Sequence, residues 1–68
     1  MTLPEKITLL MQQNNYTQAD IARRSGMTQS AISQFMKRKR VPNAFSLVRL
    51  AYALNVRVGS LLDGVDFP

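Results

Sequence analysis

Basic side chains dominate the middle of the chain in a pattern that suits an anionic partner. Between Ile21 and Leu62 there is no acidic residue, whereas eight lysines and arginines fall in this span: Arg23, Arg24, Lys37, Arg38, Lys39, Arg40, Arg49 and Arg57. Such a one-sign segment favours a polyanion, because each neutralised phosphate releases condensed counterions. Charge alone leaves three alternatives open: nucleic acid, an acidic membrane surface, or a solvated basic surface that only aids solubility.

A second group of polar residues lies just before the tetrabasic run 37–40. It consists of Gln29, Ser30, Ser33 and Gln34. Amide and hydroxyl groups can hydrogen-bond the edges of bases, although the same residue types form the ordinary polar surface of many helices. The acids form no pair spaced for acid–base catalysis, and the chain has neither cysteine nor histidine nor a glycine-rich phosphate loop. We therefore predict no enzyme activity, no metal and no cofactor.

The 68 residues are enough for one small domain, which we place at residues 1–68. Without cysteine its stability must come from helix packing, helped by a partner subunit if one is present. No apolar run approaches the ~20 residues of a membrane span, and the first residues do not resemble an export signal. We expect a cytoplasmic protein that has no membrane contact and no separate ligand-binding or oligomerisation domain.

Helix signals occur five times along the chain, and no segment shows the alternation of a β-strand, so the predicted fold class is all-α. Thr2 with Glu5, and Thr17 with Asp20, form capping boxes that open the first two helices. Thr28 and Asn43 are good N-caps, while Gly26 and Asn55 are suited to helix ends. The predicted helices cover about 4–13, 18–25, 29 to 36 or 37, 44–54 and 58–62.

The segment 18–35 has the spacing of two helices that pack at a steep angle. Ala22 allows close approach, Gly26 accepts a left-handed turn, and apolar side chains at Ile21, Met27, Ile32 and Phe35 fill the angle between the helices. Here the sequence resembles the helix-turn-helix of the lambdoid phage repressor and Cro (Xre-type) family, and Ala22, Gly26, Ile32 and Phe35 match its pattern position by position. The resemblance continues through Val41-Pro42, the helix 47–54 and the ending 56–62.

The resemblance implies a compact five-helix, lambda-repressor-like domain whose helix-turn-helix spans about 17–37. The helix from Gln29 would enter the major groove of double-stranded DNA with its N-terminal residues at base edges. The residues then predicted to contact bases are Gln29, Ser30, Ser33 and Gln34. Those predicted to contact phosphates are Gln18 and Thr28, at helix N-termini, and Lys37, Arg38, Lys39 and Arg40 beyond the helix.

One departure from the family concerns the end of this helix. Many relatives have Gly or Asn-Gly there, whereas this chain has Met36-Lys37-Arg38, which would allow the helix to extend further. By contrast, Arg23 and Arg24 are expected to be solvent-exposed helix residues.

The C-terminal region, about 55–68, has more apolar side chains than so small a core needs. Relatives dimerise near this point, which implies a homodimer interface formed by Val56, Val58, Leu61, Val65 and Phe67. Phe45 and Tyr52, off the main apolar stripe of their helix, are candidates for either the core or such a contact. The leading interpretation is a Cro-like repressor that binds an inverted-repeat operator as a homodimer. The alternatives are a restriction–modification controller, an antitoxin that also binds a toxin, and an interaction module that does not read DNA.

Overall fold

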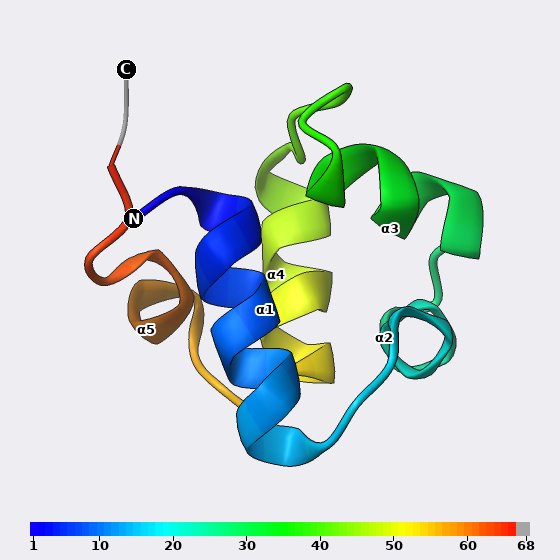
Figure 1. Ribbon diagram of the computed structural model, residues 1–68, viewed down its shortest axis with the longest axis horizontal. Coiled ribbons are helices and arrows are strands. Elements are labelled where there is room, and N and C mark those ends of the chain that lie inside the picture. The colour runs from blue at the N-terminus through cyan, green and yellow to red at the C-terminus, as the bar shows by residue number, and fades with distance from the viewer. Residues whose placement is uncertain (67–68) are drawn as a thin grey trace.

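The computed structural model describes residues 1–66 and contains five helices but no strand in that part of the chain (Figure 1). This confirms the all-α fold class and the number of helices. None of the five is long and apolar enough to cross a lipid bilayer. The helices are α1 (Leu3–Asn14), α2 (Gln18–Ser25), α3 (Gln29–Met36), α4 (Ala44–Ala53) and α5 (Val58–Leu62).

Side-chain caps fix where the first four helices begin. Both predicted capping boxes form, and Thr28 and Asn43 accept hydrogen bonds from the backbone N–H groups of Ala31 and Ser46. The Asp20 carboxylate accepts the backbone N–H of Thr17, and this bond, followed by one from the Arg23 guanidinium, lowers the pKa of Asp20. The caps satisfy N–H groups that have no partner within a helix.

Left-handed residues end the same four helices. They are Asn15, Gly26, Arg38 and Asn55, with φ between 57° and 72°. In each case the next residue donates its N–H back to a carbonyl of the last turn, as in a Schellman ending. Asn and Gly tolerate this conformation well, which agrees with the predicted helix ends at Gly26 and Asn55, whereas Arg38 was not expected to adopt it.

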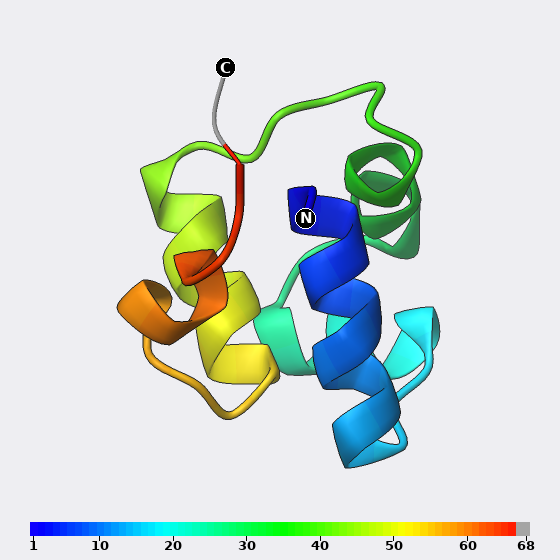
Figure 2. The same cartoon turned by 60° about the vertical axis from the view of Figure 1, so that its left-hand side comes forward.

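The core receives buried side chains from all five helices, and α1 and α4 occupy the middle of the view in Figure 1. The pair α2 and α3 lies on one side of them and α5 on the other (Figures 1 and 2). Helix α2 packs against both α3 and α4. The largest fully buried side chains come from all five helices, and they are Ile7, Ile21, Ile32, Leu50, Leu54 and Leu61.

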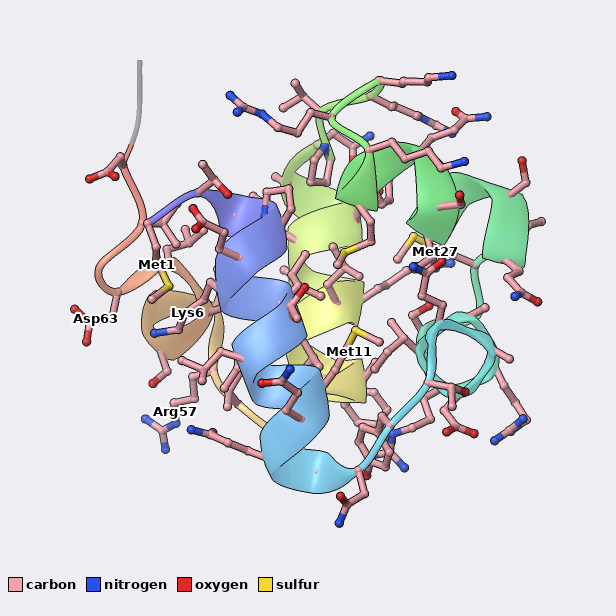
Figure 3. All side chains as sticks on the ribbon, viewed as in Figure 1. Met1, Lys6, Met11, Met27, Arg57 and Asp63 are labelled. Atoms are coloured by element: carbon pink, nitrogen blue, oxygen red, sulfur yellow. The ribbon has the colours of Figure 1, made fainter. Side chains whose placement is uncertain are left out.

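The position of Leu61 corrects one prediction. Its side chain is 0% exposed and belongs to the core, so it is not available for a dimer interface. Val56 and Val58 are half-buried and also pack against the core. Helix α5 closes the core against α1, and Lys6 Nζ donates a 2.8 Å hydrogen bond to the carbonyl of Asp63 at this contact (Figure 3). Phe67, predicted for the same interface, lies outside the described residues.

Arg24 corrects a second prediction, because it joins α2 to the end of α4 instead of facing solvent freely. Its Nε donates to the carbonyl of Ala53 and its Nη2 to the side-chain oxygen of Asn55, both at 2.8 Å. The guanidinium also lies over the Tyr16 ring, 4.6 Å from the centroid. Asn55 in turn donates to the Tyr16 hydroxyl at 3.0 Å, so the ends of α1, α2 and α4 share one polar network.

Arg24→Ala should therefore lower the free energy of unfolding by about 1–2 kcal/mol, because two charge-assisted hydrogen bonds are lost. Arg23→Ala is the matched control, since Arg23 is exposed and, within residues 1–66, pairs only with Asp20 one turn away. Its effect should stay within about 0.5 kcal/mol. Urea denaturation of both variants measures the difference, and equal effects would show that the Arg24 network adds no stability.

Candidate nucleic-acid interface

The turn between α2 and α3 is short and closed by local hydrogen bonds. Gly26 has φ 72°, and the N–H of Met27 donates to the carbonyl of Ala22 at 3.1 Å. The buried Ser25 hydroxyl donates to the same carbonyl at 3.2 Å and accepts from the N–H of Met27 at 3.3 Å. Met27, labelled at this connection in Figure 3, packs partly buried against the core. The turn thus sets the direction in which α3 leaves α2.

Helix α3 has one buried face and one polar face. Ile32 and Phe35 are buried against α2 and the core, as their spacing predicts. Of the four residues predicted to contact bases, Gln29, Ser30 and Gln34 are exposed and Ser33 is half-buried. Gln34 Nε2 lies 3.5 Å from Ser30 Oγ one turn earlier. The structure therefore brings these four polar side chains to one helix and leaves three of them exposed.

The N-termini of α2 and α3 have different surroundings. At α3 the Thr28 side-chain oxygen accepts the N–H of Ala31 at 3.1 Å, which leaves the hydroxyl proton to donate, and no acid lies in the first turn of the helix. At α2 the half-buried Gln18 shares the first turn with Asp20, whose carboxylate already occupies the N-terminal N–H of Thr17. The N-terminus of α3 is thus the more favourable of the two for an anion.

The tetrabasic run forms an exposed loop directly after α3. Helix α3 ends at Met36, so the extension that the sequence allowed does not occur. Arg38, at φ 61°, takes the left-handed position, and its N–H and that of Lys39 donate to the carbonyls of Phe35 and Gln34 at 3.1 and 2.9 Å. All four basic side chains of the loop are exposed. The loop therefore projects four positive charges beside the end of α3.

Two arginines add features that the sequence did not predict. The Arg40 guanidinium lies over the Phe35 ring, 5.5 Å from its centroid, which ties the far end of the loop back to α3. Arg49 of α4 reaches the turn between α2 and α3, where its Nη1 would lie 3.7 Å from a Cβ placed on Gly26. Neither contact has a local sequence signal, because each joins residues on different elements.

The geometry agrees with a comparison to protein families. A family model described as helix-turn-helix, of the Xre/Cro/C1 type, matches residues 7–61, which is most of the chain. The protein belongs to this family. Comparison with curated protein sequences gives no significant match.

Membership of the helix-turn-helix family makes the chain a DNA-binding transcriptional regulator. In this architecture α2 and α3 form the helix-turn-helix and α3 is the recognition helix. The four exposed lysines and arginines of the loop follow α3 directly. The caps and left-handed ends described above set the limits of α2 and α3.

The left-handed conformation of Arg38 leads to a prediction about stability. Arg38→Gly should raise the free energy of unfolding by about 1 kcal/mol, because glycine has no Cβ to crowd the following carbonyl at positive φ. Lys39→Gly is the control, since Lys39 has no positive φ and should lose stability or stay unchanged. Urea denaturation gives both values, and a loss of stability in Arg38→Gly would contradict the strain argument.

Proposed function

We propose that this protein is a Cro-like repressor that binds an inverted-repeat operator as a homodimer and acts in the cytoplasm without a catalytic step. The observation that carries the proposal is the arrangement of α3. Its inner face is held in the core by Ile32 and Phe35, while the N-terminal half of its outer face presents Gln29 and Ser30 to solvent. A rigidly held polar helix face is what reading base edges in the major groove requires.

Within the proposal, Gln29 is the principal base reader, because its amide can both donate and accept, as the N6 and N7 edge of adenine requires. Ser30, Ser33 and Gln34 supply further contacts along the same helix. Thr28 and Gln18 bind phosphates at helix N-termini. The exposed lysines and arginines of the loop, Lys37 to Arg40, bind phosphates beyond the recognition helix. The proposal thus assigns base contacts to the polar face of α3, and phosphate contacts to two helix N-termini and to the basic loop.

A homodimer is proposed because one recognition helix is too short to specify an operator. The eight residues of α3 extend only about 12 Å, which covers a few base pairs. Two copies related by a two-fold axis would read two half-sites centred about one helical turn, ~34 Å, apart. In the C-terminal region Val56, Val58 and Val65 keep some exposed surface for such a contact, whereas Leu61 does not.

The operator prediction can be tested without knowing the target gene. Selection of bound duplexes from a random pool should yield an inverted repeat with half-sites centred about 34 Å apart, and sedimentation of the complex should give two protomers per duplex. Selected sequences without symmetry, bound by one protomer, would contradict the homodimer. The absence of any sequence-selective, salt-sensitive binding would favour the interaction module, for which DNA is not the ligand.

Base and phosphate contacts should respond differently to substitution. Gln29→Ala should cost about 1–3 kcal/mol per half-site on the selected operator and leave binding to scrambled DNA nearly unchanged. Arg40→Ala should weaken both duplexes alike and reduce the slope of log affinity against log salt by about one unit per contact.

Titration of each variant against both duplexes over a salt series measures these effects, and circular dichroism confirms that the variants stay folded. The dichroism matters for Arg40→Ala in particular, because this change also removes the contact with the Phe35 ring. An equal loss of operator and scrambled binding in Gln29→Ala would show that Gln29 does not read a base. An unchanged slope in Arg40→Ala would show that this side chain does not contact a phosphate.

A further inference from the structure

The outer face of α4 carries large apolar side chains that the monomer does not use. Phe45, Val48 and Tyr52 are 82%, 54% and 74% exposed, and their spacing of three and four residues places them on one side of the helix. The opposite side holds Leu50, and Leu54 follows directly after the helix; both are fully buried. Exposure thus excludes the core role that the sequence left open for Phe45 and Tyr52. We call Phe45, Val48 and Tyr52 the α4 outer face.

The operator dimer proposed above needs an apolar contact that the C-terminal region supplies only in part. There Leu61 is fully buried, and Val56 and Val58 are half-buried against the core of their own protomer. The α4 outer face offers more accessible apolar surface than these residues.

We propose that a second copy of this chain packs on the α4 outer face, and that this pairing is weak in the free protein and completed on DNA. The inference rests on the proposed operator dimer. Two aromatic side chains of about 150–250 Å² each, mostly exposed, together with Val48, provide on the order of 400 Å² per protomer. Two copies would bury roughly 800 Å² of apolar side chain, which is below the ~1,200–2,000 Å² of stable specific interfaces.

Repulsion between the positively charged loops of two protomers explains why the dimer would be weak without DNA and more stable on DNA. Both basic loops must face the same duplex, so the N-terminal ends of the two α4 helices, which follow these loops, must lie on one side of the dimer. The α4 outer face has no acid near it in sequence, while the exposed lysines and arginines of the loop, Lys37 to Arg40, lie shortly before it. Like charges therefore approach one another in the free dimer, and phosphates between the loops would offset their repulsion.

The proposal predicts opposite salt dependences for two equilibria. Added salt should tighten dimerisation of the free protein, because it screens the repulsion, whereas it should weaken DNA binding through counterion release. Sedimentation equilibrium between ~0.1 and ~0.5 M NaCl should show a dimer dissociation constant that falls about threefold. A dissociation constant that rises over this range would overturn the electrostatic part of the proposal.

The face itself is tested by the double variant Val48→Gln/Tyr52→Gln, which keeps residues suited to a helix. Leu9→Gln on α1 is the matched control, because Leu9 is also a partly exposed apolar helix residue, at 39% exposure, but belongs to a different helix and adjoins no residue of the α4 outer face in the sequence. The double variant should sediment as a monomer at both salt concentrations, and the control should behave as the original protein does. On DNA, the double variant should bind an isolated half-site normally but the full operator about tenfold more weakly.

Full-operator affinity that is unchanged in the double variant would overturn the α4 contact. It would leave the operator dimer intact, with another surface as its interface. If the original protein binds no DNA selectively, the proposed function fails, while sedimentation still decides whether the α4 outer face pairs two copies.

The absence of cysteine allows a second measurement that does not depend on weakening the fold. Tyr52→Cys and Leu9→Cys each introduce one thiol, which a short bifunctional maleimide can join to the same thiol of another copy. Tyr52→Cys should give cross-linked dimers whose yield rises at least severalfold when operator DNA is added, and Leu9→Cys should not. Equal yields from the two variants on DNA would overturn the proposal.

Discussion

The packing of α2 against α4 is the constraint on which the placement of the recognition helix depends. Helix α3 is attached to α2 through a short turn, so the direction of α3 is only as well defined as that of α2. Ile21 and Leu50 are fully buried where these elements meet the core, and Arg24 binds the last carbonyl of α4. Apolar burial gives this packing its stability, and the directional bonds of Arg24 fix how α2 meets the end of α4.

The parts of the fold that depend on neighbouring residues could be predicted from the sequence. The capping boxes at Thr2 and Thr17 and the left-handed ends at Gly26 and Asn55 follow from residues three or fewer positions apart. The roles of Arg24 and Leu61 could not be predicted in this way. Arg24 binds a backbone carbonyl 29 residues later, and an acceptor that every residue possesses leaves no sequence signal.

At the end of one helix, a residue with an unfavourable backbone conformation lowers the stability of the fold. Three of the four left-handed positions hold Asn or Gly, which adopt that conformation at low cost, and the fourth holds Arg38. Arg38 lies in the exposed basic loop, where a glycine would fit the backbone better but would remove a positive charge. Strained backbone at a position that a binding surface needs is a common compromise between stability and function.

The distribution of charge connects the two proposed interactions of the molecule. From Ile21 to Leu62 every charged residue of the chain is a lysine or an arginine, so the residues that would attract the phosphates of DNA also oppose the approach of a second copy. A weak apolar contact on α4 would then hold two protomers together mainly when phosphates separate their basic loops. A protomer on an isolated half-site would then be held only by its contacts with DNA. Two protomers on correctly spaced half-sites would also be stabilised by the contact between them. Selectivity for an operator over scattered half-sites would thus arise from the spacing of the sites as well as from their bases.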